Sequence, residues 1–372
     1  MVDDTATIIV GAGPAGLAVA AALRRRNVPF EILERHDTVA SSWRGHYERL
    51  HLHTPKNHSA LPFVAFPKSY PRYPSREQVI EYLDAYARGF GLRPQFGIDV
   101  RRCARSADGT WQVQTNRDTR RTRRLVIASG FCRTAHRPCW PGLESFGGAV
   151  LHSSQYRSGR DFSGRTVLVV GLGNSGAEIA LDLVECGAHC EVAVRGPVNI
   201  VPRDLLGIPV IRLALAARFL PARIADAINA LAMRLTIGDL SRFAIRKRPD
   251  GPTVQILRGR QVPVVDVGTV AAIRRGAIRV RPAIASFAAD EVRFVDGTNG
   301  RFDAVILATG YDTGLRALIA DEPGLLDDAG RPRASGREAA PGLYFCGFNL
   351  VPTGLLREIA IEAGRIGRQI AS

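Results

Sequence analysis

The chain begins with an apolar run that leads into a glycine-rich turn. Residues 7–10 form a short apolar run, as in a parallel strand that is buried on both faces. The turn at 11–16 has the spacing GxGxxG, and the apolar positions within 14–26 predict a helix with one side toward a sheet. Residues 29–33 predict a second strand. The order of these segments predicts a βαβ unit.

Each glycine of this turn has a separate physical task in a dinucleotide-binding unit. Gly11 permits the tight turn, Gly13 lets the backbone approach a pyrophosphate, and Gly16 allows the helix to pack closely on the strand. The pyrophosphate is then held at the helix N-terminus. Glu34 ends the second strand and can accept hydrogen bonds from a ribose diol.

The same pattern recurs 160 residues later. An apolar strand is expected over 166–170, a second GxGxxG turn over 171–176, a helix over 177–186 and a further strand over 191–194. This strand is followed by Arg195, 24 residues after Gly171, whereas Glu34 comes 23 residues after Gly11. We therefore treat Arg195 and Glu34 as equivalent strand ends.

The two strand ends predict different nucleotides. A carboxylate repels a 2′-phosphate, whereas an arginine can pair with it. Glu34 therefore indicates FAD at the first turn, and Arg195 indicates NADPH at the second. Residues 125–130 (LVIASG) and 305–310 (VILATG) predict further strands that return beside a bound dinucleotide. Two nucleotide sites on one chain predict electron transfer from nicotinamide to flavin.

The strong positive charge changes this interpretation little. The 372 residues include 50 Lys+Arg and 35 Asp+Glu, for a formal net charge of +15. Only Lys56, Lys68 and Lys247 are lysines, so the excess is scattered arginine, as expected for a GC-rich bacterial genome. The one tight run, 117–124, has no interleaved aromatic residues. We therefore expect no nucleic-acid partner.

The remaining composition predicts a cytoplasmic protein without a metal site. The six cysteines contain no CxxC spacing and are expected to be reduced packing residues. The N-terminus lacks the features of a signal peptide. The apolar region 208–240 is interrupted by charged residues such as Arg212 and Arg218, so it predicts one or two amphipathic helices rather than a membrane span. Peripheral membrane contact stays possible for these helices.

Beyond the glycine turns, the sequence resembles the class B flavin-dependent monooxygenases. Phe146, Gly148, His152 and Tyr156 fit the FxGxxxH motif, with three further residues before Phe or Tyr, that marks the flavin-containing monooxygenases. Residues 308–311 (ATGY) fit as well. In Baeyer–Villiger relatives the first motif ends in Trp-Pro, which is absent here.

Within that superfamily the chain is most similar to the YUCCA-type enzymes, which convert indole-3-pyruvate to indole-3-acetate. His53 stands where those enzymes have His and typical amine- and sulfide-oxidising members have Asn. Residues 348–360 and 214–236 depart from the plant pattern, which leaves the substrate open. The matching stretches are LERHDTVASSWR, LHLHTPK, YPSREQVIEYL, VPRDLLG, VPVVDVGTVAAI, FVDGTNGRFDAVILATGY and GLYFCGF.

The resemblance implies an α/β fold of two Rossmann-like dinucleotide-binding domains of the three-layer ββα type. The NADPH domain, 147–299, is inserted in an FAD domain formed by 1–146 and 300–372. The implied enzyme is an NADPH- and FAD-dependent monooxygenase that forms a C4a-(hydro)peroxyflavin and oxidatively decarboxylates an aryl 2-oxo acid. Its partners are a small-molecule substrate and O2, and it acts as a monomer or a homodimer.

The expected site residues follow from the motifs and the resemblance. His53, which can control protons near the flavin, and Asn174, whose amide can hold the nicotinamide, are the catalytic candidates. A packing role for His53 and a helix-capping role for Asn174 are the alternatives. The expected cofactor-binding residues are Gly11, Ala12, Gly13, Pro14, Ala15, Gly16, Glu34, Arg35, Trp43, Arg44, Thr54, Gly130, Gly171, Leu172, Gly173, Asn174, Ser175, Gly176, Arg195, Thr309 and Gly310.

Two other functions stay open at this point. The first is oxygenation of a nitrogen, a sulfur or a ketone in a secondary-metabolite substrate, which would add one oxygen without loss of CO2. The second is a non-catalytic flavin-binding regulator, which would bind flavin without reduction by NADPH.

Overall fold

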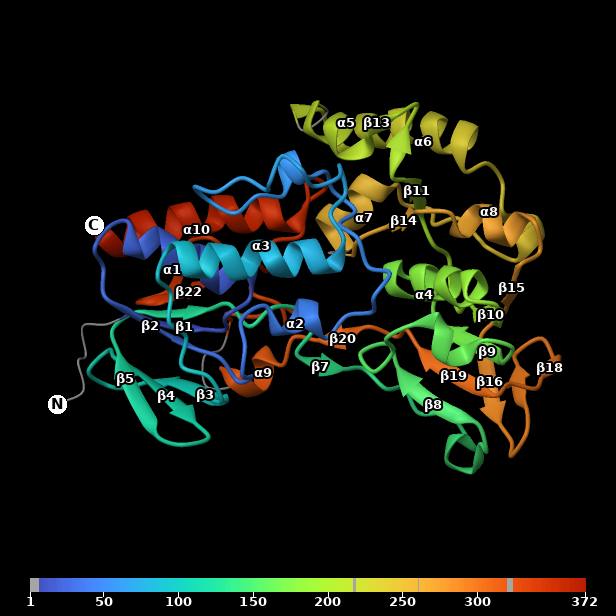
Figure 1. Cartoon of the computed structure of the whole chain (residues 1–372), viewed down its shortest axis with the longest axis horizontal. Helices are drawn as coiled ribbons and strands as arrows, with labels where there is room; N and C mark the ends of the chain where they lie inside the picture. The colour runs from blue at the N-terminus through green and yellow to red at the C-terminus, as the bar shows by residue number, and fades with distance from the viewer. Residues whose placement is uncertain (1–6, 217–218, 260, 320–323) are drawn as a thin grey trace. The chain divides into compact units, whose positions relative to one another are not determined.

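The computed structural model describes residues 7–216, 219–259, 261–319 and 324–372. The expectations about the first six residues and about Arg218 therefore lie outside the described residues. The chain forms two compact units, and each contains its own parallel sheet (Figure 1). The first comprises Met1–Gly45, Thr54–Thr134 and Tyr311–Ser372, and the second comprises His46–His53 and Ala135–Gly310.

The sheet of the first unit is built around the strand that precedes the first glycine turn. Strand β1 lies between β2 and β6, and all three are parallel. The parallel strand β22 follows β6, and the antiparallel β21 forms the edge. The strands are β1 (Thr7–Val10), β2 (Phe30–Leu33), β6 (Leu125–Ile127), β21 (Glu338–Ala340) and β22 (Leu343–Phe345).

Helices cover one face of this sheet and a small antiparallel sheet lies on the other side (Figure 1). Helix α1 packs so closely on α10 that a Cβ atom on Gly367 would lie 2.9 Å from Cβ of Ala22. Helix α3 begins with a capping box between Ser75 and Gln78. These elements are α1 (Pro14–Arg24), α3 (Arg76–Gly89), α10 (Leu355–Ala371), β3 (Val100–Arg105), β4 (Trp111–Thr115) and β5 (Thr119–Thr122), and the unit also contains α2 (Ser41–Arg44), η1 (Lys56–His58) and α9 (Leu315–Leu318).

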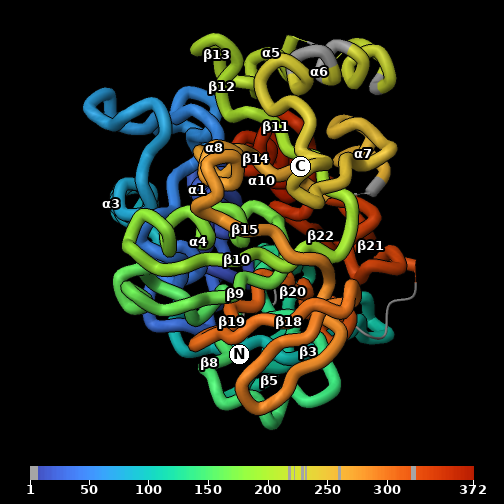
Figure 2. The backbone as a smooth tube through the Cα atoms, turned by 90° about the vertical axis from the view of Figure 1, so that its right-hand side faces the viewer, coloured from blue at the N-terminus to red at the C-terminus, as the bar shows by residue number. Residues whose placement is uncertain are grey.

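The second unit repeats the arrangement around the second glycine turn. Its sheet is wholly parallel, in the order β15, β10, β9, β19 and β8, which can be followed across Figure 2. Helix α4 follows β9 and packs with α8. The bounds are β8 (Ala149–His152), β9 (Thr166–Val170), β10 (His189–Ala193), β15 (Ile278–Arg281), β19 (Ala304–Leu307), α4 (Asn174–Glu185) and α8 (Thr269–Arg274).

Smaller elements complete the second unit. An antiparallel sheet of three strands contributes Phe287, Val292 and Phe294 to a cluster with Phe146 of the FxGxxxH motif. These elements are η2 (Leu143–Ser145), η3 (Gly159–Phe162), β11 (Ile200–Pro202), β12 (Asp204–Leu205), β13 (Ile208–Pro209), α5 (Val210–Ala216), α6 (Ala222–Thr236), η5 (Ser241–Phe243), α7 (Pro252–Gly259), β14 (Val264–Asp266), β16 (Ile284–Phe287), β17 (Val292–Phe294) and β18 (Asn299–Gly300). The short strands β7 (Thr134–Ala135) and β20 (Tyr311–Asp312) lie where the chain passes between units.

The expected fold class, two Rossmann-like units with the second inserted in the first, agrees with this architecture. The unit bounds differ from the expected ones, because 46–53, 135–146 and 300–310 group with the second unit. Strand β19 explains the difference at 300–310, since it lies between β9 and β8 in the second sheet. Residues 308–310 therefore return beside the second glycine turn.

One or two helices were expected over 208–240, and the described part of this region contains two, α5 and α6. Neither these nor any other helix in the described ranges is long and apolar enough to cross a membrane. The six cysteines form no disulfide, and Cys103, Cys190 and Cys346 are buried packing residues. Cys132 and Cys139 are exposed, so the expected packing role is wrong for these two.

Candidate functional site

The first glycine turn has a backbone shape that only glycine can adopt. Gly11 has a φ of +108°, and a Cβ atom there would lie 2.7 Å from the carbonyl oxygen of Ala128. A Cβ atom on Gly16 would lie 1.8 Å from the carbonyl oxygen of Gly11. A Cβ atom on Gly13 would meet nothing within 4 Å. The backbone around Gly11 and Gly16 therefore leaves no room for a side chain, whereas the space next to Gly13 is not filled by protein atoms.

The second turn has the same geometry. Gly171 has a φ of +101°, and its Cβ atom would lie 2.8 Å from the carbonyl oxygen of Ala308. A Cβ atom on Gly176 would lie 1.9 Å from the carbonyl oxygen of Gly171, and one on Gly173 would again meet nothing within 4 Å.

Both turns lead into helix N-termini that can receive an anion. Gly13 caps α1 and Gly173 caps α4, and neither helix has a side-chain capping hydrogen bond. The first N–H groups of each helix are thus left for another acceptor, and the macrodipole favours negative charge there. In both units, a glycine with free space beside it precedes a helix N-terminus that has no side-chain cap. This arrangement fits a dinucleotide pyrophosphate. Pro14 and Ala15 open α1, and Leu172 is buried inside the second turn.

Glu34 is a buried carboxylate that the first turn holds in place. Its Oε2 accepts a hydrogen bond of 2.7 Å from the N–H of Ala12, and its Oε1 accepts from the N–H of His36 at 3.0 Å and from Oγ of Ser41 at 3.3 Å. A carboxylate has about four lone-pair directions, so capacity is left for a ribose hydroxyl. The neighbouring Arg35 instead donates to the ring of His36.

Arg195 does not occupy the strand position that corresponds to Glu34 but lies one residue after it. Val10 pairs with Leu33 in the first sheet, and Val170 pairs with Ala193 in the second. The register counterpart of Glu34 is therefore Val194, and Arg195 lies one residue beyond it. The equivalence inferred from chain offsets was wrong by this one residue. Arg195 is nevertheless exposed directly after β10.

Arg44 already has a carboxylate partner. Its guanidinium lies 2.7 Å from Asp84 and also donates to the carbonyl oxygen of Val39. This pairing occupies the guanidinium of Arg44 and does not support its expected role in cofactor binding. The neighbouring Trp43 stays an expected cofactor-binding residue. Thr54 shares a hydrogen bond of 2.7 Å with Ser59.

Three expected cofactor-binding residues lie shortly after β6 or β19. These two strands pair with β1 and β9, the strands that lead into the glycine turns. Gly130 and Gly310 both have positive φ, and a Cβ atom on either would meet nothing within 4 Å. The hydroxyl of Thr309 donates to the carbonyl oxygen of His136 at 2.5 Å. Gly130 thus lies beyond β6 in the first unit, whereas Thr309 and Gly310 lie beyond β19 in the second.

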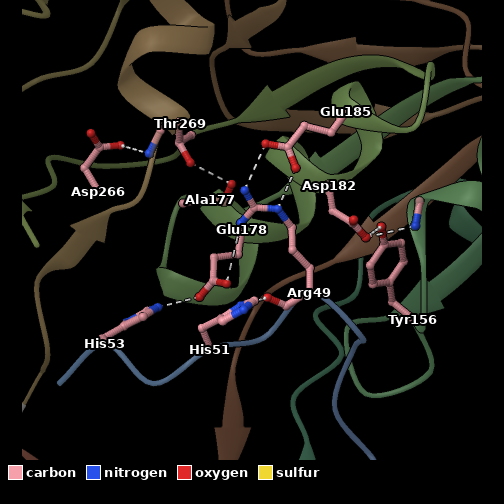
Figure 3. A network of polar contacts seen from close by, with 12 residues as sticks. Arg49, His51, His53, Tyr156, Ala177, Glu178, Asp182, Glu185, Asp266 and Thr269 are labelled. Atoms are coloured by element: carbon pink, nitrogen blue, oxygen red, sulfur yellow. Dashed lines mark hydrogen bonds and ion pairs between the residues drawn. The ribbon is translucent and has the colours of Figure 1, made fainter. Parts of the chain in front are cut away.

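His53 is paired with a buried carboxylate. Its Nε2 lies 2.5 Å from Oε1 of Glu178, whose side chain is 3% exposed (Figure 3). Glu178 follows the second glycine turn by two residues and lies on the buried side of α4. A proton role for His53 stays a prediction, and any such role has to involve Glu178.

Asn174 uses both ends of its amide on the backbone. Its Nδ2 donates to the carbonyl oxygen of Pro263 at 3.1 Å, and its Oδ1 accepts from the N–H of Val265 at 2.7 Å. Asn174 is the first residue of α4, so it does not act as the helix cap. These bonds tie the turn to β14 and do not support the expected contact with nicotinamide.

His152 of the FxGxxxH motif is the last residue of β8, the edge strand of the second sheet, and is fully buried. Its ring contacts Oγ of Ser154 at 3.0 Å and the carbonyl oxygen of Gly310 at 3.1 Å. Burial lowers the pKa of His152, which favours the neutral ring. Tyr156 of the same motif donates to Asp182 on α4 at 2.6 Å. Both residues therefore support the second unit structurally.

The sequence motifs do not indicate the role of Glu178, because its partners are distant in the chain. The available signal was a charged residue at a helix position where the neighbouring Ala177 and Ile179 predict burial, since a buried charge needs a partner. Among the described residues no group of three or more His, Cys, Asp or Glu could hold a metal ion.

Comparisons with known proteins identify the family. Residues 8–204 match the model of the pyridine nucleotide-disulphide oxidoreductases. The indole-3-pyruvate monooxygenase YUCCA1 of Oryza sativa subsp. japonica is 40% identical over 349 residues, which cover 92% of this chain and 86% of that protein. The probable indole-3-pyruvate monooxygenase YUCCA1 of Arabidopsis thaliana is 37% identical, with 97% and 89% covered.

Solved structures show the same fold. A flavin-containing monooxygenase from Stenotrophomonas maltophilia superposes with a TM-score of 0.72 at 24% identity, covering 98% of this chain and 97% of that one. An oxidised steroid monooxygenase bound to NADP gives a TM-score of 0.78 at 19% identity, with 98% and 85% covered. The chain therefore belongs to the flavin-dependent monooxygenase family that includes the YUCCA indole-3-pyruvate monooxygenases.

Proposed function

We propose that the chain is an FAD- and NADPH-dependent monooxygenase that oxidatively decarboxylates an aryl 2-oxo acid of the indole-3-pyruvate type. The observation that carries the proposal is the pair of matching glycine turns, each open at its middle glycine and each followed by an uncapped helix. The relatives at 37–40% identity, which are named indole-3-pyruvate monooxygenases, supply the substrate class.

The first unit is proposed to hold FAD. Backbone N–H groups at the start of α1 bind the pyrophosphate. Gly13 has no side chain, so the pyrophosphate can approach the backbone closely. Glu34 accepts hydrogen bonds from the adenosine ribose, and its bond from Ala12 keeps the carboxylate next to the turn.

The second unit is proposed to hold NADPH. The start of α4 binds the pyrophosphate, and exposed Arg195 pairs with the 2′-phosphate. Asn174 anchors the turn to β14 through two backbone bonds. When bound, the nicotinamide supplies a hydride, and the flavin passes its electrons to dioxygen.

The proposed reaction balances without another reactant. The 2-oxo acid, O2, NADPH and one proton give the acid shortened by one carbon, CO2, NADP+ and water. The bond between the ketone and carboxyl carbons breaks, one oxygen atom of O2 enters the product carboxyl group, and the other leaves as water.

We also propose the setting in which the enzyme works. The arginine-rich composition supports a bacterial source. For such an enzyme we propose a cytoplasmic location. The partners are then a small-molecule substrate and O2, with no nucleic acid.

The test is turnover by the purified yellow holoenzyme with indole-3-pyruvate or phenylpyruvate. The proposal predicts NADPH oxidation coupled to formation of the shortened acid. Release of hydrogen peroxide alone would show that the acid is not oxygenated. A product heavier by one oxygen, with its carboxyl group intact, would assign simple oxygenation instead.

A further inference from the structure

Most of the exposed large hydrophobic residues of the described chain lie in one part of the second unit, between 206 and 262. The side chains of Leu206, Phe219 and Leu235 are 94%, 82% and 77% exposed, more than any other large hydrophobic residue described. Single exposed hydrophobic residues are ordinary, but a group of them marks a surface that contacts a partner. We call this group the 206–235 face, and it consists of Leu206, Ile208, Phe219, Leu220, Ile224 and Leu235.

A leucine occupies the tip of the β12–β13 hairpin. Leu205 pairs with Ile208, so Leu206 and Gly207 form a turn of two residues. Both have positive φ, +48° at Leu206 and +78° at Gly207. Turns of this kind favour Asn, Asp or Gly, because positive φ is unfavourable for other residues. The chain therefore holds a leucine in an unfavourable backbone conformation, and that leucine gains almost no burial within the chain.

Helix α6 exposes apolar and basic side chains on the same face. Ile224 and Leu235 are eleven residues apart, which is about three helical turns, and both are exposed. Arg223 and Arg234 have the same spacing and are exposed next to them. The side of the helix that contains Met233 is buried. An exposed face that combines leucine or isoleucine with arginine is typical of helices that lie in a membrane interface.

The exposed helices and the hairpin lie next to each other. The β12–β13 hairpin, α5 and α6 are close together in both views of the chain (Figures 1 and 2). Helix α5 contacts β13, and α6 packs on α7 and β11. The residues of the 206–235 face therefore belong to one region of the second unit rather than to separate places on its surface.

The basic residues of this region are not neutralised by its acids. Residues 203–250 include nine Arg and Lys against four Asp. The four aspartates are bonded to two neighbouring arginines, to a serine and to the first N–H groups of α7. Arg212 of α5 and Arg223 and Arg234 of α6 are exposed, and within the described ranges none of the three has an ion pair. The charge of the region thus fits an anionic partner.

We propose that the 206–235 face docks on the surface of a lipid bilayer that contains anionic phospholipids. Its apolar side chains enter the boundary between headgroups and acyl chains, and Arg212, Arg223 and Arg234 pair with lipid phosphates. A second copy of the chain fits this face poorly, since a symmetric contact would bring the same arginines together on two chains of net charge +15. The inference does not depend on the reaction that the enzyme catalyses.

The main experiment measures binding of the FAD-loaded full chain to sedimentable vesicles of equal parts phosphatidylcholine and phosphatidylglycerol. Leu206→Ser and Leu235→Ser should each lower the partition coefficient about tenfold, because each removes an apolar side chain that leaves water on binding. Val295→Ser is the matched control, since Val295 is 63% exposed but lies outside the face, after β17. It should change the partition coefficient by less than about twofold.

A second pair of variants tests the contribution of charge. Arg234→Gln should lower the partition coefficient about fivefold, the contribution of one arginine close to an anionic membrane. Arg301→Gln is its control, because Arg301 is also exposed but pairs with Asp290 outside the face. Vesicles of phosphatidylcholine alone should bind the wild-type protein at least about tenfold more weakly.

Two results would overturn the proposal. If Leu206→Ser and Leu235→Ser bind the mixed vesicles as the wild type does, net charge alone attracts the protein and the face does not dock. If these variants instead shift a monomer–dimer equilibrium in sedimentation velocity and leave vesicle binding unchanged, a second copy of the chain covers the face. Flavin content and melting temperature, measured on every variant, show that each is folded.

Discussion

Glu362 accepts a hydrogen bond of 2.6 Å from the N–H of Gly347, which lies two residues beyond the sheet strand β22. Gly347 in turn lies so close to α1 that its Cβ atom would be 3.0 Å from Cβ of Ala15. Glu362 is 1% exposed, and burial raises its pKa from 4.5 to about 7. The folded protein therefore binds a proton here that the unfolded chain has released.

This proton makes stability depend on pH. The folded pKa is raised, so the contribution of Glu362 is fully present below about pH 4.5 and is lost as the pH rises through 7. The loss amounts to about 3 kcal/mol, since one pKa unit corresponds to about 1.4 kcal/mol. Glu362→Gln keeps an acceptor for Gly347 and should remove this loss, so the variant should be more stable than wild type at pH 8.

Urea unfolding at pH 5 and pH 8 measures the effect. Glu338→Gln is the matched control, because the exposed Glu338 also accepts from a glycine N–H, that of Gly342 at 2.7 Å. The control should follow the wild-type pH dependence. If Glu362→Gln follows it too, the buried carboxyl is not the source of the loss.

Alanine at the last glycine of each turn should disrupt the turn itself. The added Cβ atom would lie 1.8 Å from a carbonyl oxygen in Gly16→Ala and 1.9 Å in Gly176→Ala, which forces the backbone apart. We expect a loss of about 3 kcal/mol in unfolding free energy for each. Gly16→Ala should also lose FAD during purification, as seen in its absorbance spectrum, whereas retention of flavin at full stability would contradict the close packing.

Alanine at the middle glycines should instead affect binding alone. A Cβ atom on Gly13 or Gly173 meets no protein atom within 4 Å, so stability without cofactor should change by less than about 0.5 kcal/mol. The methyl group lies where the pyrophosphate approaches, so the dissociation constant should rise about tenfold, for FAD in Gly13→Ala and for NADP+ in Gly173→Ala. If Gly13→Ala weakened binding of NADP+ and Gly173→Ala weakened binding of FAD, the assignment of the two cofactors to the two units would be reversed.

Arg195 should determine the choice between NADPH and NADH. Arg195→Ser removes the proposed partner of the 2′-phosphate and should raise KM for NADPH about 10- to 100-fold, the range of a charge-assisted hydrogen bond. KM for NADH should stay within about twofold. Arg301→Ser is a control, since that exposed arginine pairs with Asp290. Equal changes with both nucleotides would show that Arg195 does not read the phosphate.

The two βαβ units could be predicted because their signals are local. Each consists of an apolar strand, a GxGxxG turn and a helix within about 25 residues, and strands Thr7–Val10 and Thr166–Val170 begin and end at the expected residues. Helix α4 begins three residues before the expected position, since its first turn is part of the glycine motif.

Contacts between distant residues could not be predicted in this way. The His53–Glu178 pair joins residues 125 positions apart, and β19 joins the second sheet by pairing with β8 and β9. Hydrophobic periodicity indicates which residues are buried but not which partners they meet. The offset of Arg195 likewise depends on strand register, which a count of residues along the chain does not give.

The central claim is tested most directly by a stoichiometric measurement with a carboxyl-labelled aryl 2-oxo acid. The FAD-loaded enzyme is supplied with NADPH and O2, and labelled CO2, the shortened acid and consumed NADPH are quantified together. The account predicts equal amounts of all three, with little hydrogen peroxide. NADPH consumption that yields hydrogen peroxide without labelled CO2, or an oxygenated product that keeps the label, would contradict it.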